Sequence, residues 1–205
     1  MDFITLLDWI CTAVFAITGA LAAVEKRMDL GGALLLAFIT GTGGGTLRDL
    51  LLDREVFWLT THTPIYLCAA AAIVTFFATR SVGKLGPAIL WIDAIGLALF
   101  STAGATIALK AGADPVICVL MGACSATGGG IIREVVRNEI PIVLQRDIYI
   151  TAALAGATVL VLLDRAGLDL RLANLLGAAV AFALRAAGIA FNLSLPAPKP
   201  LTPER

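Results

Sequence analysis

The segment GTGGGTLRD, residues 41–49, lies inside a stretch whose hydropathy predicts one membrane helix. It places three successive glycines, an arginine and an aspartate at a depth where a bilayer disfavours charge. The segment TGGGIIRE, residues 127–134, repeats the same order of glycines, arginine and acid. One offset of 85 residues separates Gly43 from Gly128 and Arg48 from Arg133. The chain is therefore a duplicated unit with a polar defect at the same depth in each half.

The composition indicates a membrane protein, since 59% of the 205 residues are hydrophobic and 15% are charged. The mean hydropathy is +0.93. A net charge of zero argues against a nucleic-acid partner, and a single histidine argues against a Ser-His-Asp catalytic centre. The four cysteines lie in apolar segments without the spacing of a zinc site. We therefore expect membrane lipids as partners, and no enzyme activity, metal or cofactor.

Seven segments are long and apolar enough to be considered membrane helices, taking roughly 20 residues per span. They are residues 3–24, 30–52, 63–80, 86–109, 115–137, 148–164 and 171–192. Short linkers predict one membrane domain, residues 1–195, followed by a proline-rich tail, residues 196–205.

Lysine and arginine are distributed unequally between the two sets of helix ends, and the richer set is expected in the cytoplasm. The prediction is an outside N-terminus and a cytoplasmic C-terminus. The eight residues at the richer ends are Lys26, Arg27, Arg80, Lys84, Arg137, Arg146, Lys199 and Arg205, and the four at the other ends are Arg54, Lys110, Arg165 and Arg171.

The duplication extends beyond the glycines, because Asp8 matches Asp93 and Phe15 matches Phe100 at the same offset. Residues 3–80 and residues 86–164 therefore form two repeats of three spans each. Since three is an odd number, the second repeat must enter the membrane from the opposite side. The predicted fold is an all-α membrane protein with an inverted 3+3 repeat and a seventh helix that serves packing or assembly.

Three successive glycines favour non-helical dihedrals and cost roughly 1 kcal/mol each relative to alanine. We therefore expect the second and fifth spans to be broken at the triplets, with freed carbonyl groups lining a polar path near the bilayer midplane. The alternative is close helix packing by small residues. The path residues expected at the two motifs are Thr42, Gly43, Gly44, Gly45, Thr127, Gly128, Gly129 and Gly130.

Arg48 and Arg133 complete this candidate path, because an arginine at membrane depth needs a cavity or a partner. Asp49 and Glu134 follow them directly and are secondary candidates. Adjacent helical residues point about 100 degrees apart, so we expect each acid to find its partner on another segment or in water. The alternative is that these side chains snorkel to the headgroups.

Three further charged residues lie within the predicted spans. Asp93 is deep enough in its span to contribute to a cation path. Asp8 is closer to its helix start, where exposure to solvent is equally compatible with the pattern. Arg185 lies outside the repeat, so a contact between helices or subunits is expected there.

Duplicated GGG-x-x-R-[DE] motifs in the second and fifth of seven spans resemble the bacterial relatives of the trimeric intracellular cation (TRIC) channels. The same sequences are also grouped as glycine transporters. The resemblance implies a homotrimer in a bacterial inner membrane, with one pore in each subunit and potassium as the chief permeant ion. It also implies kinks at the triplets, residues 43–45 and 128–130.

Two functions fit these features. A channel needs a continuous wet path, whereas a transporter needs an enclosed site and two alternating states. Inverted repeats and broken helices occur in both classes. In a transporter of a zwitterion such as glycine, Arg48 or Arg133 would bind the carboxylate; in a potassium channel they would act as gates or electrostatic barriers.

Overall fold

The computed structural model describes residues 3–79, 85–145 and 147–194. The seven long helices confirm the predicted spans, and a one-turn helix, α3, precedes α4. The helices are α1 (Phe3–Glu25), α2 (Leu30–Leu51), α3 (Phe57–Thr60), α4 (Thr63–Thr79), α5 (Gly86–Lys110), α6 (Pro115–Val136), α7 (Ile150–Arg165) and α8 (Leu170–Phe191), with a short 3-10 turn, η1 (Ile142–Leu144). Five are 22 residues or longer and apolar enough to cross a bilayer, whereas α4 and α7 have 17 and 16 residues.

Five of the basic residues at the predicted cytoplasmic helix ends lie outside the described residues. The C-terminal tail, residues 196–205, also lies outside them. The basic residues concerned are Arg80, Lys84, Arg146, Lys199 and Arg205.

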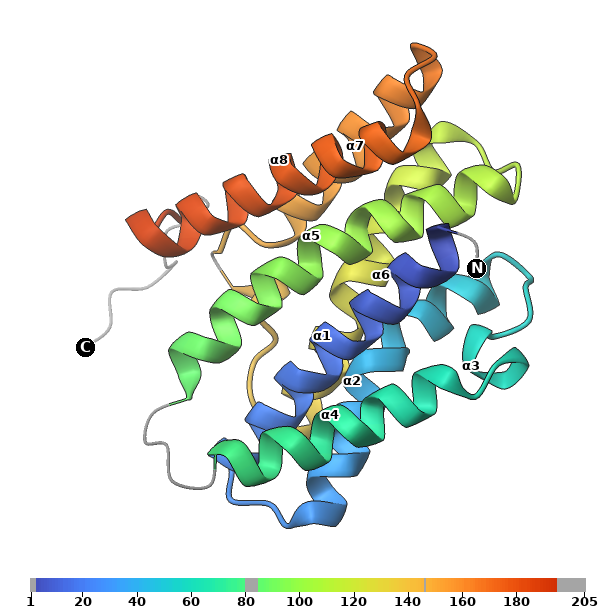
Figure 1. Cartoon of the computed structure of the whole chain (residues 1–205). Coiled ribbons are helices and arrows are strands. Elements are labelled where there is room, and N and C mark those ends of the chain that lie inside the picture. Colours follow the sequence, from blue (N-terminus) through green and yellow to red (C-terminus); the bar gives the residue numbers. More distant parts are fainter. Residues whose placement is uncertain (1–2, 80–84, 146, 195–205) are drawn as a thin grey trace, which may run out of the picture.

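The helices form two matching groups of three. Within the first repeat α1, α2 and α4 contact one another, and within the second α5, α6 and α7 do the same. The halves meet through α1 against α5 and α2 against α6. Figure 1 shows α1 and α5 side by side and running in opposite directions, as an inverted repeat requires.

Helix α8 has no equivalent in the first repeat. It packs on α5 and α7 at the edge of the molecule opposite α4 (Figure 1). A Cβ added to Gly156 of α7 would lie 2.6 Å from the Cβ of Ala181 and 2.7 Å from the carbonyl oxygen of Gly177. The small residues of α8 are therefore used for close packing inside the protomer.

The local sequence determines where several helices begin and end. The carboxylate of Asp29 accepts a hydrogen bond of 2.8 Å from the amide of Gly32 and caps α2. Asp53 and Asn138, 85 positions apart, follow α2 and α6 in the left-handed conformation, with φ of 51° and 56°. Aspartate and asparagine tolerate this conformation better than most residues. The duplication is thus visible in the helix ends as well as in the motifs.

The glycine triplets do not break their helices, so the prediction of discontinuous second and fifth spans is wrong. Both α2 and α6 run through their triplets as single α-helices. The reason is that an intact helix satisfies its own backbone polar groups, whereas a break in hydrocarbon leaves carbonyl groups that need other partners. The glycines instead allow α2 and α6 to touch where they cross.

The contacts at this crossing are reciprocal between the two repeats. A Cβ added to Gly44 would lie 2.1 Å from the carbonyl oxygen of Ser125, and one added to Gly129 would lie 2.2 Å from that of Thr40. Gly44 and Gly129 are 85 positions apart, as are Thr40 and Ser125. A side chain at either glycine would displace the neighbouring backbone. The close packing of small residues therefore accounts for the triplets.

Candidate functional site

Two arginines are buried close to the α2–α6 crossing. Arg48 is 1% exposed and Arg133 is fully buried. An arginine cannot lose its proton, so its charge must be balanced by acceptors and counter-charges where it is buried. Each arginine accordingly lies in a cluster of polar groups drawn from several helices.

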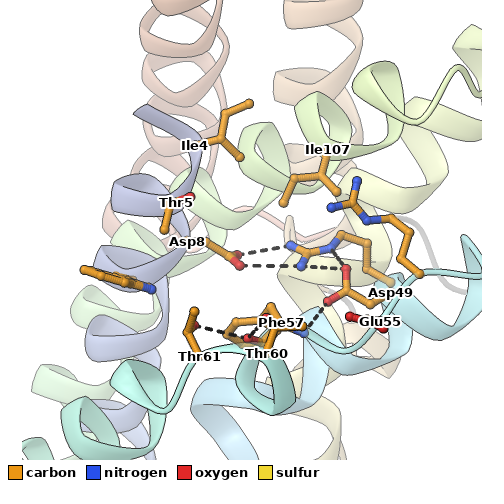
Figure 2. Close-up of a pocket in the computed structure, with 12 residues that line it drawn as sticks. Ile4, Thr5, Asp8, Asp49, Glu55, Phe57, Thr60, Thr61 and Ile107 are labelled. Atoms are coloured by element: carbon orange, nitrogen blue, oxygen red, sulfur yellow. Dashed lines mark hydrogen bonds and ion pairs between the residues drawn. The ribbon is translucent and has the colours of Figure 1, made fainter. Parts of the chain in front are cut away.

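The first cluster joins α1 and α2. The Nε of Arg48 donates to Oδ1 of Asp49 at 2.8 Å, and its Nη1 donates to Oδ1 of Asp8 at 3.1 Å. The second oxygen of Asp49 accepts from the amide of Phe57 at 3.0 Å, which attaches the start of α3 to the cluster. Figure 2 shows the Asp8 and Asp49 carboxylates converging on one guanidinium, with Phe57 beside them.

The second cluster joins α5, α6 and α1. Arg133 donates from Nε to Oε1 of Glu134 at 2.9 Å and from Nη1 to Oδ1 of Asp93 at 2.7 Å. Its Nη1 also donates to the hydroxyl of Thr18 at 2.9 Å. Asp93 is 1% exposed. Glu134 is 6% exposed, the same as Asp8 in the first cluster, so the charged residues of the two clusters are buried to a similar extent.

The prediction that Arg48 and Asp49, or Arg133 and Glu134, do not pair directly is wrong. Both pairs form contacts of 2.8 Å between Nη2 and the adjacent acid. The 100-degree separation applies to the Cα–Cβ directions, whereas the arginine side chain is long enough to bring its guanidinium to the neighbouring carboxylate. The acids also reach other groups: Asp49 accepts from the backbone of Phe57, and Glu134 lies 3.5 Å from Arg137.

One signal in the sequence could have identified the other partner of each arginine. Asp8 precedes Arg48 by 40 positions, and Asp93 precedes Arg133 by the same number. The exposure considered for Asp8 is not observed, because its residue exposure is 6%. Each cluster contains two carboxylates and one guanidinium and so has a formal charge of −1. Such a site attracts cations in preference to anions.

The two clusters lie at opposite ends of the crossing. Helix α1 contacts both, since Asp8 binds Arg48 and Thr18 binds Arg133. Ten residues separate Asp8 from Thr18, which corresponds to about 15 Å along a helix axis. Thr42 and Thr127 are buried between the clusters, and each hydroxyl donates to a carbonyl oxygen four residues earlier in its own helix.

The first cluster opens into a cavity of about 460 Å³. Arg54 and Glu55 lie at its rim and are exposed, while Asp8, Arg48 and Asp49 are at its base. Figure 2 shows the surrounding side chains from α1, the α2–α3 linker and α5. The open end of the molecule is defined here by this cavity and the Arg48 cluster. The cavity is large enough to hold several water molecules.

The second cluster is closed. The cavity bounded by Gly130, Arg133, Glu134, Val143 and Tyr149 leaves no room for a water molecule. A Cβ added to Gly130 would lie 3.0 Å from the hydroxyl oxygen of Tyr149. The closed end is defined here by this cavity and the Arg133 cluster. Tyr149 therefore occupies the place at the closed end that corresponds to the cavity at the open end. The open-end cavity is called the vestibule below.

The third glycine of each triplet faces an aromatic side chain. A Cβ on Gly45 would lie 2.7 Å from the ring of Phe57, and Gly130 faces Tyr149 as described above. Sequence reasoning missed both aromatic residues, and also Thr18. The reason is that neither aromatic residue is repeated at the 85-residue offset, where Ile142 corresponds to Phe57 and Pro64 to Tyr149, so the repeat contains no signal for them.

Further ion pairs extend outward from the closed end. Arg137 lies 3.5 Å from Glu134 and 2.6 Å from Glu25 at the end of α1. Lys26 pairs with Glu139 at the surface and lowers the pKa of that carboxyl. These contacts connect the α1–α2 turn to the end of α6.

Comparisons with known proteins agree with the duplication. The family model described as glycine transporter matches residues 5–80 and again residues 90–165, two matches separated by the same offset of 85. The UPF0126 inner membrane protein YadS of Escherichia coli strain K12 is 39% identical over 193 residues, which is 93% of either chain.

Solved structures also resemble this chain. A crystal structure of the TRIC trimeric intracellular cation channel orthologue from Rhodobacter sphaeroides has a TM-score of 0.90 and 45% identity, covering 94% of this chain and 100% of that one. A prokaryotic TRIC channel crystallised in 0.5 M KCl has a TM-score of 0.85 and 32% identity, covering 94% and 98% of the two chains.

Proposed function

Because this chain belongs to the prokaryotic TRIC channel family and itself matches the glycine transporter model, we propose that it is a monovalent cation channel that chiefly conducts potassium. The observation that carries the proposal is the pair of net-negative clusters at opposite ends of the α2–α6 crossing. Negative sites at both ends of a path favour cation entry and disfavour anions.

The proposed path runs inside each protomer. It begins at the open end, passes Arg48, Asp49 and Asp8, and follows the α2–α6 crossing toward the Arg133 cluster. The conformation described is a closed state, because Tyr149 and the Arg133 cluster leave no room for water at one end. In this conformation α2 and α6 touch at the crossing, so the path there forms only when the two helices separate. The lining proposed for that open state comprises Thr42, Gly43, Gly44, Gly45, Thr127, Gly128, Gly129 and Gly130.

The assembly and orientation proposed are a homotrimer in the bacterial inner membrane, with the closed end and the C-terminus in the cytoplasm. Residues 1–195 form the membrane domain and residues 196–205 a cytoplasmic tail. Support comes from the trimeric Rhodobacter structure, the inner-membrane relative and the positive residues near the closed end. Native mass measurement in mild detergent should give three protomers, and a monomer or dimer would contradict the assembly.

A second candidate is a transporter of a small zwitterion such as glycine. A vestibule open at one end only is what one state of an alternating-access cycle would have, and the family description favours the same substrate. The Arg48 guanidinium would then bind the carboxylate of the substrate.

Recording from planar bilayers distinguishes the two candidates. The channel should give discrete single-channel steps in potassium chloride, with a reversal potential that follows the potassium gradient. Empty bilayers and bilayers with heat-inactivated protein are the controls. Absence of steps, together with saturable glycine exchange in vesicles made from the same preparation, would favour the transporter.

A further inference from the structure

Helix α8 reaches the closed end through one buried arginine. Arg185 is 1% exposed and lies 5.1 Å from the ring centroid of Tyr149, measured from its Cζ atom. Its Nη1 donates to the carbonyl oxygen of Ile148 at 3.2 Å and lies 3.7 Å from Oδ2 of Asp147. A single guanidinium therefore contacts three successive residues at the entrance of α7.

The backbone of α8 also approaches this segment closely. A Cβ on Gly188, one turn after Arg185, would lie 3.2 Å from the Cβ of Ile148. Ser194, just beyond α8, forms an antiparallel bridge with Asp147. The segment that presents Tyr149 to the Arg133 cluster is thus attached to α8 along residues 147–149.

Arg185 is poorly compensated for a buried cation. Its nearest carboxylate in the described part of the chain, Asp147, has a side chain that is 40% exposed. Its Nε has no hydrogen-bond partner among the described residues. A well-packed apolar residue would fill such a position at lower cost. The arrangement is better explained by the group that the guanidinium holds in place, which is the Tyr149 ring.

The first repeat offers a comparison without such a helix. The positions equivalent to residues 147–149 are His62, Thr63 and Pro64, at the start of α4. Helix α8 packs on α5 and α7, and where its Arg171 reaches the first repeat it contacts Phe3 of α1, not residues 62–64. The vestibule in that half is open. The closed end is the one to which α8 is attached.

From these contacts we infer that Arg185 is the positioning residue of the closed end, holding Tyr149 against the Arg133 cluster, so that displacement of α8 opens the path. The interpretation of this closure as a channel gate rests on the proposed function. The closure itself can be tested independently of which solute is conducted, because a water-filled cavity beside Gly130 admits a thiol reagent in either class of protein.

The test uses Ile131→Cys as a reporter, since Ile131 lines the closed cavity. A small cationic methanethiosulfonate is applied to the protein in nanodiscs, and the parent chain without the reporter gives the background from the four native cysteines. Arg185→Gln should increase the modification rate at least about tenfold, because the rate follows the population of the open form. Tyr149→Ala should increase the modification rate similarly. The double variant, Arg185→Gln with Tyr149→Ala, should be modified at nearly the same rate as either single variant.

Arg171→Gln is the matched control. Arg171 lies near the other end of α8, where its Cζ is 5.7 Å from the ring centroid of Phe3, so this variant removes an exposed arginine–ring contact from the same helix. It should leave the modification rate unchanged. Arg185→Lys retains the charge, loses the planar stacking group and should give an intermediate rate.

The outcomes separate the two proposals. Faster modification and a higher open probability in bilayers, at unchanged unit conductance, support both. Faster modification without currents in any variant supports the role of Arg185 and contradicts the channel. An unchanged rate in folded Arg185→Gln overturns the inference. If that variant does not fold, an unchanged modification rate in both Arg185→Lys and Tyr149→Ala overturns the inference. Additive effects of the Arg185→Gln and Tyr149→Ala substitutions in the double variant also overturn it.

Discussion

The open and closed ends of this molecule contain the same three charged groups in different surroundings. At the open end, the Asp8–Arg48–Asp49 cluster forms the base of a cavity of about 460 Å³. At the closed end, the corresponding cluster is covered by Tyr149 and the η1 segment. The duplicated charges therefore do not determine whether water can reach a cluster. We attribute the difference in accessibility to the connections after α2 and α6, whose sequences differ between the repeats, and to α8, which is attached to residues 147–149.

Substitutions at the α2–α6 crossing, which lies between the open and closed ends, should reduce the free energy of unfolding most. Gly44→Ala and Gly129→Ala should each destabilise the protein by about 3 kcal/mol, because the new methyl group meets a backbone oxygen that cannot move alone. Unfolding in mild detergent measures the loss. Gly43→Ala is the control, since its Cβ would meet the mobile end of Ile132 at 2.8 Å and should cost about 1 kcal/mol. A large loss for only one of the two central glycines would show that the centre is not symmetric.

The next effect separates the two ends. Asp93→Asn should cost up to about 3 kcal/mol, because it leaves a fully buried arginine with one carboxylate and no access to water. Asp8→Asn should cost about 1 kcal/mol, since water in the vestibule can replace the lost oxygen. The same unfolding measurement compares them. Equal losses would mean that the open and closed ends are equally solvated.

A smaller effect is expected on conduction and depends on the channel proposal. Arg48→Gln should raise potassium conductance about twofold at 0.1 M salt, because the vestibule becomes more negative, and the increase should shrink at 1 M salt as screening grows. Arg133→Gln should instead alter the open probability. Single-channel recordings at the two salt concentrations measure both quantities. A salt-independent change for Arg48→Gln would indicate an altered shape of the path.

The smallest effect lies at the surface of the closed end. Lys26 lowers the pKa of the Glu139 carboxyl, so this pair stabilises the fold above the ordinary carboxyl pKa of about 4.5. The contribution is lost as pH falls through the lowered pKa of the folded state. Glu139→Gln should remove this part of the pH dependence, with only a slight change in melting temperature at neutral pH. A slope that survives in the variant would assign it to other carboxyl groups.

The sequence predicts the helices and the duplication because hydropathy and an ungapped offset are directly readable from it. The burial of Arg48 and Arg133 follows from their depth in apolar segments. The role of the triplets does not follow, because glycine permits both a helix break and close helix packing, and only the neighbouring helix decides between them. Tyr149 and Phe57 escape prediction because neither aromatic residue is repeated at the 85-residue offset, and their placement depends on how the starts of α7 and α3 pack on the rest of the protein.

The reciprocal contact at the crossing also limits how a duplicated chain can diverge. Gly44 faces the backbone of Ser125 while Gly129 faces the backbone of Thr40, so each half supplies both a glycine and the surface that requires one. A larger residue in one copy cannot be accommodated by a smaller one in the other, because the obstacle is main chain. After the duplication, the sequences of the two halves could therefore diverge at the open and closed ends, while the glycines at the crossing had to be retained in both halves.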